Sequence, residues 1–125
     1  MTTIKLVEEF NKAFNLPLPQ KPSLSEPTAM LQIALMEEEF DEMVTAFHLG
    51  DETGVLDGLL DMQYILDGLF IKFGMAQFKE PGFKEVHASN MSKLGEDGKP
   101  ILRDDGKILK GPNYFKPNLD QFLGA

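Results

Sequence analysis

The stretch TAMLQIALMEEEFDEMVTAFHL, residues 28–49, decides the fold of this protein. It contains neither proline nor glycine, so nothing in it interrupts a helix. Apolar side chains recur in it at intervals of three or four residues: Ile33, Met36, Phe40, Met43 and Phe47. This spacing is typical of an α-helix with one apolar face. We therefore predict a helix over about 28–49 whose apolar stripe is turned toward the core.

A second helix is predicted directly after the first. Gly50 is suited to end the first helix, and Asp51 is a suitable N-cap for the next one. Residues 55–73 are apolar on nearly every face of a helix, and Gly74 follows as a stop signal. A helix of this composition is expected to be buried.

The flanking segments predict shorter elements. Residues 4–14 have helical apolar spacing, four prolines make 15–27 a loop, and 83–91 suit a shorter helix. Asp97-Gly98 and Asp105-Gly106 predict two turns with short extended arms, or one small hairpin. These strands are too few for a sheet fold, so the fold class expected is all-α.

The predicted chain divides into a helical part, about residues 1–92, and a turn-rich tail, about 93–125, that lies over the helices. With 125 residues and 14.0 kDa, the whole chain suits a single domain. Its 12 basic and 20 acidic side chains give a net charge of −8, which argues against nucleic acid or an anionic membrane as a partner. The sequence has no cysteine, so disulfides, thiolate zinc sites and a cysteine nucleophile are excluded.

The beginning of the chain lacks the pattern of a signal peptide. No apolar run approaches the roughly 20 residues that span a bilayer. A cytoplasmic protein is therefore expected.

Acidic side chains on the two long helices are the strongest chemical signal. They are Glu38, Glu39, Glu42, Asp57 and Asp61. The two aspartates lie one turn apart in an otherwise apolar segment, where a carboxylate without a partner costs several kcal/mol. No Lys or Arg occurs between Lys21 and Lys72, so a cation from outside is required. Oxygen ligands favour Mg²⁺ or Mn²⁺. A solvated acidic face is the competing interpretation.

The acidic pattern resembles that of the MazG-like all-α nucleoside triphosphate pyrophosphohydrolases, which include the phosphoribosyl-ATP and dimeric dUTP enzymes. Their mark is Glu-Glu-x-x-Glu on one helix and Glu-x-x-Asp on the next. Residues 38–42 match the first part, and Asp61 matches the last position of the second. Gly58 stands where the family has glutamate, and the adjacent Asp57 is the candidate replacement.

Two tail segments extend the resemblance over most of the chain. Val86–Leu94 and Lys110–Phe115 look like the tail of a subgroup of these proteins. The resemblance implies a helical bundle that assembles as a homodimer or homotetramer. An apolar helix at 55–73 favours the same conclusion, because one small bundle cannot easily cover it.

The resemblance implies hydrolysis of a nucleoside triphosphate between the α and β phosphates, giving a monophosphate and pyrophosphate, as in nucleotide-pool house-cleaning. Glu38, Glu39, Glu42 and Asp61 would hold Mg²⁺ or Mn²⁺, with Asp57 as a further ligand. Glu38 or Glu39 would orient or deprotonate the attacking water. Candidates to hold the outer phosphates or the sugar are Asn90, Lys93, Lys107, Lys110 and Tyr114.

Two other functions remain open at this point. One is a non-catalytic helical interaction protein whose acids bind a structural cation, with Gly58 marking lost activity. The other keeps the enzyme but makes phosphoribosyl-ATP its substrate. The first differs from the enzyme by having no Mg²⁺-dependent turnover.

Overall fold

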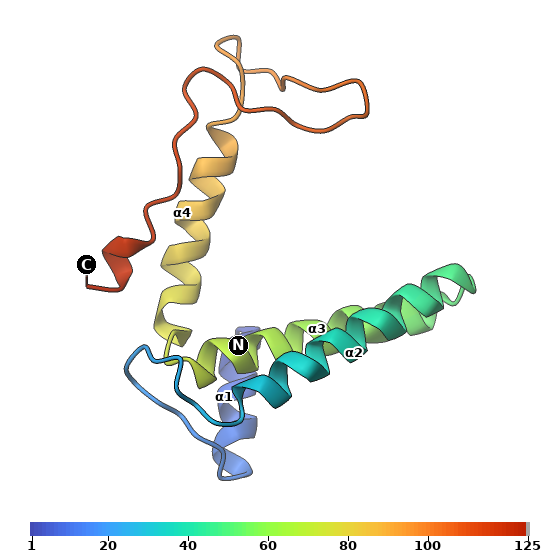
Figure 1. The fold of residues 1–125 in the computed structure, drawn as a ribbon, viewed down its shortest axis with the longest axis vertical. Coiled ribbons are helices and arrows are strands. Elements are labelled where there is room, and N and C mark those ends of the chain that lie inside the picture. Colours follow the sequence, from blue (N-terminus) through green and yellow to red (C-terminus); the bar gives the residue numbers. More distant parts are fainter. Residues whose placement is uncertain (125) are drawn as a thin grey trace. The chain divides into compact units, whose positions relative to one another are not determined.

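The computed structural model describes residues 1–124, and its ribbon is drawn in Figure 1. The helices are α1 (Thr3–Ala13), α2 (Ala29–His48), α3 (Glu52–Lys72) and α4 (Lys79–Met91), with short 3₁₀ turns at Ala76–Phe78 and Asp120–Phe122. Over the described residues there is no strand, only one isolated bridge, so the all-α prediction is confirmed. None of these helices is long and apolar enough to cross a membrane.

The chain forms two compact units, one of residues 1–77 and one that begins at Phe78. The first unit holds α1, α2 and α3, and the second holds α4 and the tail. Each unit is described by itself below. That residues 1–125 form a single domain stays a prediction.

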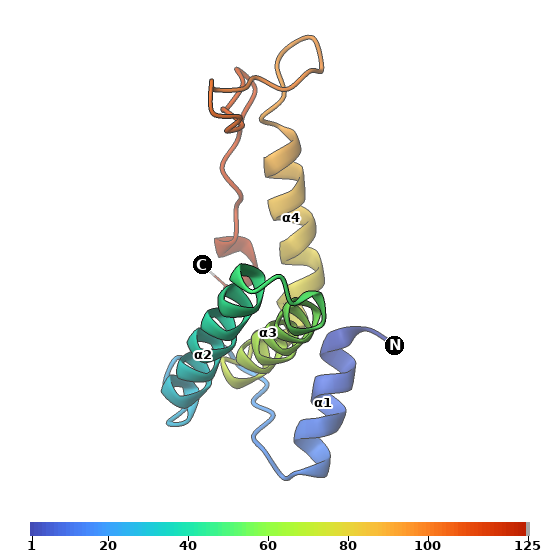
Figure 2. The ribbon, with the colours of Figure 1, turned by 90° about the vertical axis from the view of Figure 1, so that its right-hand side faces the viewer.

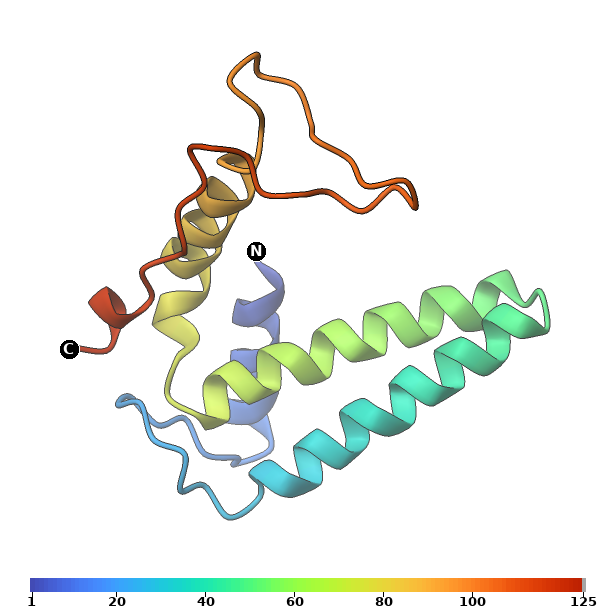
Figure 3. The same ribbon diagram turned by 45° about the horizontal axis from the view of Figure 1, so that its top comes forward.

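In the first unit, α2 and α3 form an antiparallel helical hairpin (Figure 3). Gly50 makes the turn between them with φ +69°, a conformation that glycine adopts without strain. The side chain of Asp51 caps α3, because its Oδ1 accepts a hydrogen bond from the Gly54 amide at 3.0 Å. The predicted helix, stop and cap are therefore confirmed, although α3 begins three residues earlier than expected.

Facing residues fix the register of the seam between α2 and α3. Lys72 Nζ donates a hydrogen bond to Thr28 Oγ1 at 2.8 Å, and Gln32 Nε2 donates one to the Ile65 carbonyl at 3.2 Å. The side chain of Gln32 also lies against Gly68, so a step of four residues forward from Thr28 meets a step of four backward from Lys72. The remaining pairs follow this order: Glu39 with Asp61, Met43 with Gly58, and Ala46 with Gly54.

The seam includes Met43 of the apolar stripe that the sequence suggested, but not the two phenylalanines of that stripe. Phe40 and Phe47 are exposed in the chain, at 52% and 66%, whereas Glu39 is half-buried and Ala46 is buried. That part of the prediction was wrong. The reason lies in α3, whose glycines bring its backbone close and leave room for Met and Ala but not for two phenylalanine rings.

The expectation that α3 is buried was also wrong for the single chain. Leu56, Leu59, Leu60 and Leu66 are all more than two fifths exposed. Only two helices of the first unit pack on α3, which leaves part of its circumference uncovered.

Helix α1 packs beside α3 (Figure 2). It buries Val7 and Asn11, and the ring of Phe10 meets the ring of Tyr64 edge-on at 5.7 Å. The loop that follows α1 returns to the end of α3, where the Ser23 amide donates to the Phe73 carbonyl at 3.0 Å. The predicted helix at 4–14 and the proline-rich loop are confirmed.

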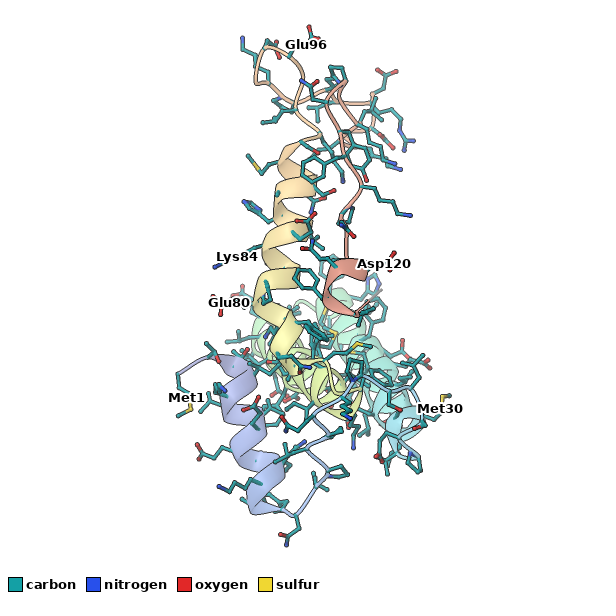
Figure 4. All side chains as sticks on the ribbon, turned by 90° about the vertical axis from the view of Figure 1, so that its left-hand side faces the viewer. Met1, Met30, Glu80, Lys84, Glu96 and Asp120 are labelled. Carbon is teal, nitrogen blue, oxygen red and sulfur yellow. The ribbon has the colours of Figure 1, made fainter. Side chains whose placement is uncertain are left out.

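In the second unit, α4 begins at Lys79, four residues before the predicted start. Pro81 is tolerated there because first-turn amides have no partner within a helix. Glu80 and Lys84 pair on the outer surface one turn apart, at 3.5 Å (Figure 4). The tail runs back along α4, with the Asn118 amide donating to Glu85 Oε1 at 3.1 Å.

The second of the two predicted turns, at Asp105-Gly106, closes one small hairpin in the tail. Leu102 and Ile108 make an antiparallel bridge, and the Leu109 amide donates to the Ile101 carbonyl at 2.8 Å. Gly106 occupies the turn with φ +89°. The hairpin prediction is confirmed.

Gly58→Ala is expected to destabilise the protein. A Cβ at this position would lie 2.8 Å from the Met43 Cβ and 3.3 Å from its Cα, so the helices would have to separate. Overpacking of this kind costs about 1–3 kcal/mol and outweighs the gain of about 1 kcal/mol in helix propensity. Gly82→Ala on α4 is the matched control, because a Cβ there meets nothing within 4 Å. Thermal melts should move in opposite directions, and equal shifts would contradict the tight seam.

Candidate active site

Glu39 and Asp61 face each other across the middle of the seam between α2 and α3. Removal of water raises the pKa of Glu39, and the negative charges of Glu42, Asp61 and Asp57 raise it further. A hydrogen bond between the carboxyls of Glu39 and Asp61 acts in the same direction. The structure therefore brings four of the five predicted acids into one electrostatic neighbourhood.

Glu38 is placed differently. Its side chain is exposed, and its charge is not among those that raise the pKa of Glu39. The cause is helical geometry, because successive residues project about 100° apart around the axis and Glu39 occupies the seam. A role for Glu38 stays a prediction.

Basic side chains do not neutralise this acidic neighbourhood. The charges that act on Glu39 are all negative. The ion pairs of Lys5, Lys84 and Arg103 use the carboxylates of other residues. Lys72 is buried at the end of α3, where its ammonium group bonds Thr28.

The donor atoms suit a hard divalent cation, because all of them are carboxylate oxygens. As the side chains stand, no three acidic or histidine groups within residues 1–124 converge closely enough to hold a metal ion. These carboxylate oxygens suit Mg²⁺ or Mn²⁺, but the side chains do not form a complete set of ligands around one point.

Gly58, which stands where the family has glutamate, has a packing role in the structure. Gly58 is buried against Met43, so this position serves the packing of the seam. The exposed Asp57 next to it contributes a charge that acts on Glu39. A carboxylate close to the expected position thus comes from the neighbouring residue.

The five predicted substrate-binding residues lie in the second unit. Lys110 Nζ lies over the ring of Tyr114, 4.8 Å from its centroid. Lys93 is half-buried near the end of α4, whereas Asn90 and Lys107 are exposed. The structure therefore brings together Lys110 and Tyr114.

Sequence reasoning missed three buried polar residues of the first unit. Asp67 on α3 is fully buried, and Asn11 and Lys72 are nearly so. Asp67 carried a usable signal, because it is another carboxylate in the apolar segment that drew attention to Asp57 and Asp61. Asn11 and Lys72 carried none, since polar residues at helix ends are usually exposed.

The raised pKa of Glu39 predicts how metal-free stability varies with pH. The folded state holds the Glu39 proton more tightly than the unfolded chain, so its stability falls as pH rises from the ordinary value of 4.5 through the raised pKa. Glu39→Gln lacks this loss. In a chelator, the variant should gain melting temperature relative to wild type as the pH rises above about 4.5. Glu37→Gln should show no such gain, and a difference independent of pH would contradict the placement of Glu39.

Without strands over its described residues, and with opposed acids on an antiparallel helix pair, the chain has the features of the MazG-like all-α nucleoside triphosphate pyrophosphohydrolase superfamily. The family model for phosphoribosyl-ATP pyrophosphohydrolase matches residues 7–90. The chain belongs to this family, whose members are pyrophosphohydrolases. No curated protein gives a significant individual match. The matched segment includes all five predicted acids and ends before most of the tail.

Proposed function

We propose that the chain is a Mg²⁺-dependent nucleoside triphosphate pyrophosphohydrolase that releases a monophosphate and pyrophosphate. The single observation that carries this proposal is the set of acids around Glu39 at the seam, within a family of nucleotide pyrophosphohydrolases. A polyphosphate is itself negative, so such a site binds it only with the help of cations.

Glu39, Glu42 and Asp61 would hold Mg²⁺ or Mn²⁺, with Asp57 and Glu38 as the further ligands. Such a cation, when bound, neutralises phosphate charge and lowers the pKa of a coordinated water.

Glu39 is the best candidate for the general base. Its raised pKa brings it closer to neutral pH, where a base is most effective, and its position at the seam orients it toward the other acids. Glu39, or Glu38 in its place, takes one proton of the attacking water. The water oxygen bonds to a phosphorus of the α–β anhydride as the bond from that phosphorus to the bridging oxygen breaks, and the two products separate.

A second candidate substrate is phosphoribosyl-ATP, because the matching family model carries that name. We rank it below a house-cleaning role on nucleoside triphosphates, since the long tail resembles that subgroup and lies mostly outside the matched residues. Both substrates contain the same α–β anhydride.

The proposal is tested by a panel of the common ribo- and deoxynucleoside triphosphates and phosphoribosyl-ATP with Mg²⁺. Pyrophosphate and the monophosphate should appear in equal amounts from at least one substrate. Inorganic phosphate as the primary product would contradict cleavage at the α–β bond. The absence of turnover with every substrate would favour the non-catalytic interaction protein.

We expect the protein to be a homodimer or homotetramer. Large apolar residues are exposed on both long helices of the single chain, among them Leu31, Phe47, Leu56 and Leu60 at 58–66%. Patches of this kind mark interfaces, where apolar and aromatic residues are enriched. Light scattering at micromolar concentration should give two or four times the chain mass of 14.0 kDa. The mass of a single chain would contradict this prediction.

A further inference from the structure

Two serine hydroxyls, of Ser89 in the last turn of α4 and of Ser92 just after it, hold the backbone of the tail at one residue. Ser89 Oγ donates a hydrogen bond to the Phe115 carbonyl at 2.7 Å, and Ser92 Oγ accepts one from the Phe115 amide at 3.1 Å. Ser89 is 2% exposed, so its hydroxyl depends on this partner rather than on water. Both backbone polar groups of Phe115 are thus satisfied by these hydroxyls. We call these two serines the serine clamp.

A second anchor lies four residues earlier in the tail. The backbone of Gly111 passes so close to the end of α4 that a Cβ there would collide with the carbonyl oxygens of Leu94 and Lys93. The Tyr114 amide then donates to the Gly111 carbonyl at 3.2 Å, which closes a turn. The segment between the two anchors has its conformation fixed from both ends.

Tyr114 lies inside this fixed segment and determines where Lys110 is held. The Lys110 ammonium group is 4.8 Å from the centre of the Tyr114 ring, within the range of a cation–π contact. Lys110 is otherwise exposed, so its charge stays accessible. The serine clamp therefore fixes the backbone of Phe115. Phe115 in turn fixes the adjacent Tyr114, whose ring holds the ammonium group of Lys110.

Charge favours a phosphate chain as the ligand of this lysine. Residues 1–77 have four basic and thirteen acidic side chains, a net charge of −9, whereas residues 78–125 have eight basic and seven acidic. Without bound cations, the side chains of the first unit therefore repel an anionic ligand, whereas those of the second unit are nearly balanced in charge. A lysine binds phosphate as a point charge, and a lysine held in place loses less freedom on binding.

We propose that Ser89 and Ser92 are positioning residues that hold Lys110, through Phe115 and Tyr114, for the phosphate chain of the nucleotide. The identity of the ligand as a nucleotide rests on the proposed function. The assignment of Lys110 as a phosphate-binding residue does not need the metal or the acids of the first unit.

Binding of inorganic tripolyphosphate in a chelator tests the lysine directly, because without divalent cations the acids cannot bridge to phosphate. Lys110→Ala should weaken this binding about tenfold by calorimetry, the equivalent of one charge contact. Lys116→Ala is the matched control, an exposed lysine of the same tail, and should change the affinity less than twofold. In a Tyr64→Phe background Tyr114 is the sole tyrosine, so its fluorescence should report the binding.

The clamp is tested by variants that leave Lys110 in place. Tyr114→Phe keeps the ring face and should bind tripolyphosphate like wild type, whereas Tyr114→Leu should lose affinity as Lys110→Ala does. Ser89→Ala and Ser92→Ala should each raise KM for the nucleotide several-fold with kcat unchanged. If Ser89→Ala fails to fold by circular dichroism, the comparison of Tyr114→Leu with Tyr114→Phe decides.

The tripolyphosphate affinities and KM values of these variants decide whether the proposal stands. Equal losses in Lys110→Ala and Lys116→Ala, or no loss in either, would overturn it. Unchanged KM in folded serine variants would overturn the role of the clamp. Binding of tripolyphosphate that depends on Lys110, in a protein that releases no pyrophosphate from any nucleotide, would support the lysine and overturn the proposed function instead.

Discussion

Asp61→Asn and Glu39→Gln are each expected to reduce turnover at least ~10²-fold, within the range seen when a catalytic electrostatic or acid–base group is lost. Both replacements keep the shape of the side chain and remove one charge from the middle of the seam. Folding without metal should be retained, because the variants relieve repulsion among the acids that raise the pKa of Glu39. Steady-state release of pyrophosphate measures the loss.

Glu37→Gln and Asp41→Asn are the matched controls on α2. Both side chains are exposed and neither contributes to the raised pKa of Glu39, so turnover should stay nearly intact. Asp57→Asn tests the departure at Gly58, since a large loss would mean that Asp57 replaces the family's glutamate. Similar small effects of all these changes would mean that the acids form only a solvated face.

Removal of divalent cations is expected to abolish turnover, with at least a ~10²-fold loss in excess chelator and recovery on addition of Mg²⁺ or Mn²⁺. The reason is that carboxylates alone repel a polyphosphate. Binding of Mg²⁺ to the folded state should also stabilise it by about 2.7 kcal/mol at a hundredfold excess over the dissociation constant. The melting temperature measures this without any substrate.

Asp61→Asn is the control for the metal's effect on stability, since it should lose most of the rise in melting temperature. Turnover that survives the chelator would remove the metal from the proposal. A melting temperature that does not respond to Mg²⁺ in wild type would mean that the ligand set is not preformed.

The helices were predictable because local signals determine where each one begins and ends. Gly50 and Asp51 separate the two long helices as expected, and proline confines the loop before them. The start of α4 was predicted four residues too late, because a proline in the first turn of a helix, here Pro81, breaks no hydrogen bond.

The line of α2 that meets α3 was not predictable from α2 alone. Phe40 and Glu39 are adjacent, and hydrophobicity favours the phenylalanine for the interior. What reverses the choice is the partner helix, where Gly54, Gly58 and Gly68 form a surface that admits only close-fitting residues. The hydrophobic pattern of α2 alone therefore cannot show which of its faces meets α3.

The spacing of the acids predicted that they lie close together, and the charges of Glu42, Asp57 and Asp61 do act on Glu39. Spacing did not distinguish Glu38 from Glu39, because either one completes a cluster with Glu42 in sequence. The serine clamp had no sequence signal, since serines in a helix are common and their partner lies more than 20 residues away.

The matched register of α2 and α3 limits how this hairpin tolerates insertions and deletions. One residue added to α2 alone, beyond Gln32, would rotate everything after it by about 100° and bring a different line of side chains to the seam. Glu39 would then no longer oppose Asp61. Only additions of about seven residues to both helices beside the Gly50 turn keep the two faces aligned. The hairpin can thus be lengthened at its tip by two helical turns at a time in each helix. Its acidic middle does not tolerate a shift of one helix along the other.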